Sequence, residues 1–184
     1  WGTADGSEVY DKALMITDLA NIPLYIHSGS PSPIGGLVHG EMPRLYGEEV
    51  TRERALEVLL DKLRPGDIVS HLYSTFNGSA WQHTEDRIAH GVRASYDKGV
   101  LWDSGRGAHF KFDHVRKLTD AGILPFTIST DRHAQDAHDD FVRTSATGMC
   151  KHMSEFMALG FSLNDVILRA THNPAVALRI EDEA

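Results

Sequence analysis

The stretch Gly66-Asp-Ile-Val-Ser-His71 decides the fold, because it is a short β-branched run that ends in a histidine. Two other stretches have the same form, namely Pro23-Leu-Tyr-Ile-His27 and Pro125-Phe-Thr-Ile-Ser-Thr-Asp131. Runs of β-branched and aromatic residues are typical of buried strands. Each of these three expected strands therefore ends, at its C-terminus, in a side chain that can bind a metal ion.

Segments with helical spacing separate the expected strands. Helices are predicted over residues 7–20, 51–63 and 84–98, around Val115 up to a C-terminal Gly122, and from Val142 to Gly160. A further strand is predicted at 99–103 and a polar loop over 131–140. Near the C-terminus, Ser162-x-x-Asp165 is a capping box, and Asn173-Pro174 predicts the start of the last helix. Strands that alternate with helices on this scale predict an α/β fold with a parallel sheet.

In a parallel α/β barrel, all strand C-termini open onto one face. His27, His71 and Asp131 are therefore expected to converge there. Two imidazoles and a carboxylate suit a metal ion, and metal-activated water is the chemistry that such a site supplies. A single histidine at a strand end is more often structural. The repetition at the same topological point of three strands favours the metal site.

Length, charge and hydropathy favour a single globular domain that neither binds nucleic acid nor spans a membrane. The chain has 184 residues and a net charge of −8, which fits one domain over 1–184 with no nucleic-acid partner. A complete (β/α)₈ barrel needs about 250 residues, so only part of one fits. No apolar run approaches the roughly 20 residues of a membrane span, and a cytoplasmic location is expected. The first residue is Trp1 rather than Met, which indicates a fragment of a longer protein.

The sequence has eleven histidines, and most need no metal to explain them. His90, His114 and His152 fall in expected helices, where a solvated or capping role is predicted. Three others, His39, His109 and His133, fall in loops on the expected rim and are candidates for substrate contact.

At these strand ends and turns the chain resembles the amidohydrolase superfamily, and within it the dihydroorotase-like amidohydrolase/deacetylase family. The motifs that carry the resemblance are Pro23-Leu-Tyr-Ile-His27, Leu63-Arg-Pro-Gly-Asp-Ile-Val-Ser-His71, Phe76-Asn-Gly78, Asp103-x-Gly105-x-Gly107, Ile128-Ser-Thr-Asp131 and Thr171-x-Asn-Pro-Ala175. The resemblance runs from about residue 7 to the C-terminus. It implies a (β/α)₈ TIM barrel of which this chain covers strands five to eight.

The resemblance also implies a ligand set. His27 and His71 are expected to bind one divalent metal ion, and Asp131 to bind a second ion and act as general base. Zn²⁺ is the expected metal, because imidazole ligands suit it. Two ions are expected in the full-length enzyme. Its other ligands, a His-x-His on strand one and a carboxylated lysine on strand four, would precede Trp1.

Four residues are predicted to bind substrate: Asn77, Arg106, Gly107 and His133. Arg106 lies in a Gly-Arg-Gly turn where close relatives commonly have Gly-His-Gly. A cation at this point favours an anionic or carbonyl-rich substrate.

The resemblance predicts a metal-dependent hydrolase that cleaves a small-molecule amide or ester, as a dihydroorotase or a deacetylase does. Metal-activated hydroxide would attack the carbonyl, with Asp131 as general base. The alternative is a catalytically incompetent half-barrel that binds one metal or none and serves as a binding or assembly module. In either case, open sheet edges predict a homo-oligomer or pairing with the missing N-terminal half.

Overall fold

The computed structural model describes residues 7–29, 44–45, 48–49, 54–107, 109–131 and 148–183. The helices are α1 (Ser7–Leu19), α2 (Ala55–Leu60), α3 (Val92–Lys98), α4 (Phe112–Asp120), α6 (Met149–Ala158), α7 (Leu163–Ala170), α8 (His172–Leu178) and the 3-10 turn η2 (Glu181–Glu183). The strands are β1 (Tyr25–His27), β2 (Arg44–Leu45), β3 (Glu48–Glu49), β4 (Ile68–Ser70), β5 (Trp81–Gln82), β6 (Arg87–Ile88) and β7 (Leu101–Trp102). The predicted loop over 131–140 and the start of a helix at Val142 lie outside the described residues, except for Asp131.

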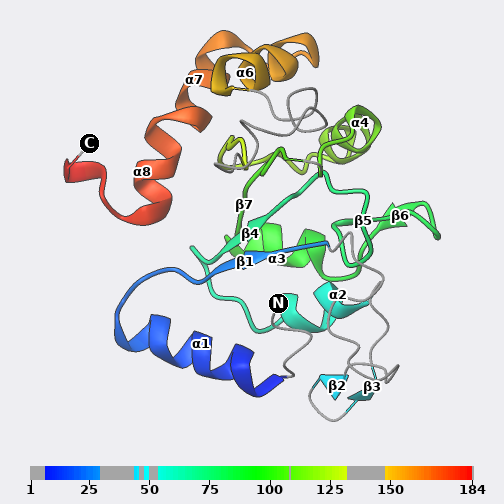
Figure 1. The fold of residues 1–184 in the computed structure, drawn as a ribbon, viewed down its shortest axis with the longest axis vertical. Coiled ribbons are helices and arrows are strands. Elements are labelled where there is room, and N and C mark those ends of the chain that lie inside the picture. The colour runs from blue at the N-terminus through cyan, green and yellow to red at the C-terminus, as the bar shows by residue number, and fades with distance from the viewer. Residues whose placement is uncertain are drawn as a thin grey trace, which may run out of the picture.

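A parallel sheet in the order β1-β4-β7 forms the centre of the fold. Its register pairs Ile26 with Val69 and Val69 with Trp102. Figure 1 shows these three strands at the centre of the molecule, with α1 on one side and α6 and α7 on the other. The prediction of parallel strands is therefore confirmed, with β1 ending at His27 as predicted and β4 ending at Ser70, one residue before the predicted end at His71.

The fourth predicted strand, 126–130, follows β7 without forming a regular strand. A single parallel bridge joins Asp103 to Thr127. Beyond it, the Arg106 N–H donates to the Ser129 carbonyl at 2.9 Å. Regular pairing stops there because the Ser129 N–H donates to the Ser104 hydroxyl at 3.1 Å and not to a backbone carbonyl.

The predicted helix over 84–98 is wrong in its first half. Residues 81–88 form an antiparallel hairpin of β5 and β6, and α3 begins only at Val92. Asp86 has a φ of 47° in the hairpin turn, and Gly91 has a φ of 79° just before α3. Both values belong to the left-handed region, which interrupts a right-handed helix.

The sequence predicted the N-termini of the last two helices from the capping box at Ser162 and from Asn173-Pro174, and only the first prediction is correct. The capping box is confirmed, because the Asp165 N–H donates to the Ser162 hydroxyl at 3.1 Å. The prediction of Asn173 as N-cap and Pro174 as first residue of the last helix is wrong by two residues, since α8 begins at His172 with Thr171 as its N-cap. The Asn173 side chain does not cap it and instead donates to the Phe126 carbonyl at 2.8 Å.

One apolar core joins the sheet to its helices. Its fully buried members include Leu60, Leu63, Val69, Trp102, Val115, Leu118, Ile128 and Phe156. Burial of such side chains contributes about 1.5–3 kcal/mol each. No helix within the described ranges has the length and apolar character needed to cross a membrane.

A buried carboxylate at Asp103 ties the strands together from inside. It accepts hydrogen bonds from the hydroxyls of Tyr25 on β1 (3.0 Å) and Ser70 on β4 (3.2 Å). It also accepts from Thr127 and Ser129 on the fourth segment, both at 2.6 Å. One side chain on β7's C-terminal extension is therefore bonded to β1, β4 and the segment after Phe126.

Removal of this carboxylate should destabilise the fold. We expect Asp103→Ala to lower the free energy of unfolding by about 3 kcal/mol or more, because it leaves up to four hydroxyl groups without their acceptor. Asp103→Asn should cost less, since its amide oxygen still accepts. Urea denaturation measures both. Asp97→Ala, which removes an exposed i,i+4 ion pair with Arg93, is the control and should change stability by at most about 0.5 kcal/mol. An Asp103→Ala value as small as the control's would contradict this role.

Candidate metal centre

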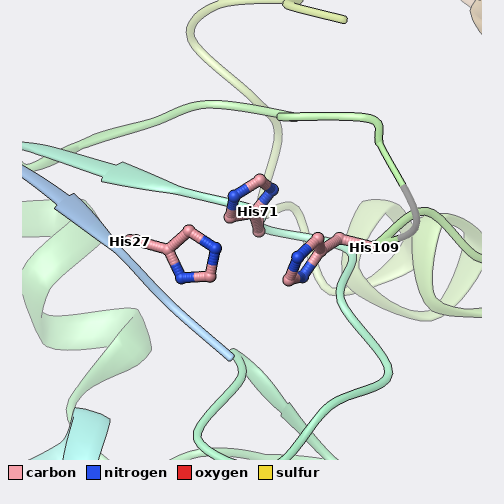
Figure 2. Close-up of side chains that lie close together, drawn as sticks. All are labelled: His27, His71 and His109. Atoms are coloured by element: carbon pink, nitrogen blue, oxygen red, sulfur yellow. The ribbon is translucent and has the colours of Figure 1, made fainter. Parts of the chain in front are cut away.

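Three histidine side chains gather at the C-terminal end of the central strands. Each of His27, His71 and His109 offers one ring nitrogen, and these nitrogens all lie within 4.8 Å of one another. The His27 and His71 ring centroids are 4.2 Å apart, and the His71 and His109 rings stack at 3.8 Å. Figure 2 shows the three rings gathered around a common space. We call this group the His cluster.

Two of the three histidines are positioned by the strands. His27 is the last residue of β1, and its register partner on β4 is Ser70, the residue before His71. His71 has a φ of 69°, which turns the chain sharply at the end of β4. Its Nδ1 lies 2.6 Å from the Gly105 carbonyl oxygen. Because that oxygen only accepts, His71 Nδ1 carries a proton, and Nε2 is the ring nitrogen left to bind a metal ion.

The turn of Gly105 leaves no room for a side chain beside His71. A Cβ at position 105 would lie 2.5 Å from His71 Nδ1 and 2.5 Å from the Ser70 hydroxyl oxygen. The backbone of Gly105 also has a φ of 45°, which favours glycine. Glycine at this position therefore lets the His71 ring lie against the backbone carbonyl that fixes it.

His109 comes from a loop and not from a strand end. Its Nδ1 lies 3.1 Å from the Ser74 hydroxyl, and the Phe76 ring meets it edge-on at 4.7 Å. Its backbone N–H donates to the Arg106 carbonyl at 3.0 Å. The sequence pattern assigned His109 only to the rim, because no strand ends at it. The turn before it folds the chain back, and this brings the imidazole into the cluster.

Two of the three imidazoles in the His cluster have a lowered pKa. Burial, and then the neighbouring His71, lowers the pKa of His27 to about 4. Burial, His71 and His27 lower the pKa of His109 to about 3. Both rings are therefore uncharged at neutral pH, and neutral imidazole is the form that binds a metal ion.

Asp131 lies beside the same turn but outside the His cluster. A Cβ on Gly107 would come within 2.2 Å of the Asp131 Oδ2 atom, so the carboxylate packs directly against this glycine. Asp131 has a φ of 50°, a conformation that costs a non-glycine residue about 1–2 kcal/mol. Its charge also reaches Tyr25, whose pKa is raised by burial, by Asp103 and, more weakly, by Asp131. Gly105 and Gly107 lie two residues apart on one turn. Gly105 thus packs against His71, and Gly107 packs against Asp131.

Arg106, between the two glycines, points to a helix. Its guanidinium forms a two-pronged ion pair with Glu155 of α6, at 2.8 and 2.9 Å. Burial opposes ionisation of Glu155, but hydrogen bonds from Arg106 and His152 outweigh it and lower its pKa. The cation expected to face substrate is thus bound to a carboxylate of its own chain.

The other predicted substrate contacts are placed as follows. Asn77 is exposed and follows Phe76, whose ring packs on His109. Gly107 is half-buried against Asp131. His133 lies outside the described residues.

A second polar chain lies behind the turn, at Ser104, His152 and Glu155. The Ser104 hydroxyl is 3.1 Å from His152 Nε2, and His152 Nδ1 is 2.9 Å from Glu155. This order of groups matches that of serine hydrolases. However, Ser104 and His152 are fully buried, so no substrate reaches the hydroxyl. The prediction that His152 is solvated or caps a helix is therefore wrong, since it joins the turn to α6.

Gly105→Ala should displace the His71 ring. We expect this change to lower the free energy of unfolding by about 2–4 kcal/mol, because backbone strain is added to a steric clash. Gly160→Ala is the matched control: Gly160 also has a positive φ, of 98°, but nothing lies within 4 Å of its added Cβ. The control should cost only about 1 kcal/mol. Equal losses in guanidinium denaturation would show that the clash with His71 does not matter.

His114, expected to be solvated or capping, is instead buried and hydrogen-bonded to the Ser74 carbonyl at 2.8 Å. Burial lowers its pKa below the ordinary value of 6.5, despite that hydrogen bond. Below pH 6.5 the unfolded chain therefore binds a proton that the folded chain does not, and stability falls as pH falls.

This titration can be measured with His114→Asn, whose amide can keep the hydrogen bond to Ser74 without titrating. Between about pH 6.5 and 5, the free energy of unfolding of the wild type should fall more steeply than that of the variant, by up to about 1.4 kcal/mol per pH unit. Urea titrations with a chelator present measure both slopes. Parallel slopes would mean that His114 protonates equally in both states.

No protein-family model matches the chain. Among curated proteins, it is similar to a deacetylase from Brucella anthropi, with 29% identity over 169 residues, which is 91% of this chain and 35% of the relative. A deacetylase from Agrobacterium fabrum is 28% identical with the same coverage of both chains. A deacetylase from Enterococcus faecalis is 24% identical over 155 residues, 84% of this chain and 35% of that protein. The chain thus spans about a third of the length of these relatives.

Solved structures agree in fold. An adenine deaminase superposes with a TM-score of 0.72 at 22% identity, covering 96% of this chain and 42% of that one. A dihydroorotase superposes with a TM-score of 0.66 at 25% identity, covering 95% and 40%. The chain therefore has the α/β architecture of part of a TIM-barrel amidohydrolase. Its resemblance to the amidohydrolase superfamily is confirmed, and the curated relatives within that group are deacetylases.

Proposed function

We propose that this chain is the C-terminal part of a metal-dependent amidohydrolase, which hydrolyses an amide or ester of a small molecule. The observation that carries the proposal is the convergence of His27 and His71 at the ends of adjacent parallel strands. Asp131 lies beside the same glycine turn that fixes His71. The similarity to deacetylases over most of the chain supports the same reaction class.

The residues present fit a divalent ion. Neutral imidazoles are ligands for Zn²⁺, and His71 is held with Nε2 available by the Gly105 carbonyl. A bound Zn²⁺ would polarise the substrate carbonyl and would lower the pKa of a bound water molecule toward neutral pH. The proposed complete enzyme has two ions, and Asp131 would be a ligand of the second. The remaining ligands would be a His-x-His and a carboxylated lysine on strands one and four.

Asp131 is the proposed general base. It would accept a proton from the attacking water as that water adds to the carbonyl carbon. The same carboxyl group would then return the proton to the nitrogen or oxygen of the leaving group as the C–N or C–O bond breaks. The products are a carboxylic acid and an amine or alcohol. Contact with Gly107 holds the carboxylate in place for both transfers.

The proposal includes how the barrel is completed. We assign the strands of this chain to positions five to eight, with β1 at the open edge. Among the described residues, β1 pairs only with β4, and Tyr25 and His27 are exposed. A parallel strand from the N-terminal half, or from a second copy, would cover this edge. Asn77, Gly107 and His133 are the proposed substrate contacts. For Arg106, whose side chain is paired with Glu155, we propose that only the backbone of its turn lies near the substrate.

The test uses the complete gene product that contains this chain. Zinc-loaded protein is assayed with N-acetyl amino acids, acetyl esters and cyclic amides, by acetate release or ring opening. We expect hydrolysis of at least one class, its loss on chelation, and its return with Zn²⁺. Asp131→Asn should lower kcat by about 10²–10⁴-fold with little change in KM, since it removes proton transfer and not binding.

Asp120→Asn, a change of an exposed carboxylate at the end of α4, is the matched control and should keep full activity. A folded, zinc-loaded protein that hydrolyses none of the three classes would contradict the proposal and favour a binding module. Full activity of Asp131→Asn would contradict the assignment of the base.

A further inference from the structure

We infer that His109 is a third imidazole ligand of the ion that His27 and His71 hold, so that this chain by itself carries a three-histidine metal site. The inference rests on the proposed function in one respect, namely that the strand ends hold a divalent ion. The inference goes beyond the proposed function by adding a metal ligand from the loop after the Gly105–Gly107 turn.

The geometry of the His cluster carries the inference. All three ring nitrogens lie within 4.8 Å of one another, and the His109 ring is closer to His71 (3.8 Å) than His27 is (4.2 Å). A tetrahedral ion with bonds of about 2.1 Å needs its ligand nitrogens about 3.4 Å apart. The His71 and His109 rings stack nearly parallel, with 18° between their planes, so binding one ion requires side-chain rotations that aim the ring nitrogens at it.

Hydrogen bonds outside the cluster fix the outer nitrogens of two rings. The Gly105 carbonyl holds Nδ1 of His71 at 2.6 Å, and the Ser74 hydroxyl holds Nδ1 of His109 at 3.1 Å. Metal-binding histidines usually have such a partner on the nitrogen that does not bind the metal. Ser74 is itself held, because its hydroxyl accepts from the Phe76 N–H and its carbonyl is bonded to His114.

An alternative role for these contacts is packing alone. Two buried imidazoles and an exposed one lie ring to ring here. Apolar packing explains this contact poorly, because each ring contains two polar nitrogens that need partners. Among the described residues, no carboxylate belongs to the group. The cluster is therefore suited to a cation that accepts nitrogen ligands.

The chemistry of the donors defines the class of ion. Three imidazole nitrogen donors suit Zn²⁺ or Co²⁺, whereas Mg²⁺ and Ca²⁺ prefer oxygen ligands. Three histidines form one of the ligand sets of catalytic zinc. Asp131, which packs on Gly107 outside the group, stays available as a base.

The test measures zinc affinity of the full 184-residue chain by competition with a chromophoric chelator, without any activity assay. We expect one ion per wild-type chain. His109→Gln should weaken binding by at least about 100-fold, more than the loss of an outer hydrogen bond costs, and as much as His27→Gln or His71→Gln. His172→Gln, at an exposed histidine of α8, is the matched control and should bind like the wild type.

The outcomes separate the two proposals. If His109→Gln binds zinc like the wild type while His27→Gln and His71→Gln lose it, the third ligand is refuted and the proposed two-histidine site stands. If the wild-type chain binds no zinc, or no histidine change weakens binding, the three-histidine site is refuted. The proposed two-ion site, which takes further ligands from strands one and four, is then decided by the chelation and activity test on the complete gene product.

A second variant covers the case in which His109→Gln fails to fold. His109→Cys keeps a metal-binding side chain, and with Co²⁺ it should show a thiolate-to-cobalt charge-transfer absorption that the wild type lacks. In the unmodified chain, Zn²⁺ should also protect all three rings from carbethoxylation, measured by mass spectrometry. Absence of the cobalt band, or protection of His27 and His71 without His109, would overturn the inference.

Discussion

The buried carboxylate of Asp103 is the constraint on which the rest of the structure depends. Three of its four hydroxyl donors lie within two residues of a candidate-site residue in the sequence. Tyr25 is two residues before His27, Ser70 is one before His71, and Ser129 is two before Asp131. Because this one group fixes the ends of the strand segments relative to one another, it also fixes where the histidines and the base emerge. A buried charge used in this way is costly unless all its hydrogen bonds are made, and here they are.

The site is built on backbone conformations that the chain would not adopt on its own. His71 and Asp131 both have left-handed φ values, of 69° and 50°. Such strain is often found at functional positions and persists only where surrounding contacts determine it. Here those contacts come from the two glycines of one turn, which meet His71 and Asp131 closely and leave no room for a Cβ. Packing of the sheet thus offsets the backbone strain at His71 and Asp131, whose side chains lie at its edge.

Much of the fold could be predicted from the sequence, because β-branched runs and helical spacing are local signals. The parallel strands and the meeting of His27 with His71 follow from such signals. The hairpin at 81–88 could not be predicted, because a single left-handed residue, Asp86, overrides the apolar spacing that favoured a helix. His109 was assigned only to the rim and the Glu155 partner of Arg106 was missed, since both depend on how a turn directs side chains toward residues far away in the chain.

In the turn at 105–107 the backbone and the Arg106 side chain contact different parts of the molecule. This difference determines which positions of the turn can change during evolution. The backbone and the missing Cβ atoms of Gly105 and Gly107 serve His71 and Asp131, whereas the side chain of Arg106 serves α6 through Glu155. Positions 106 and 155 can therefore drift as a compensating pair among descendants of this sequence without altering the histidines. The two glycines have no such freedom, and lineages that keep the site are expected to keep both.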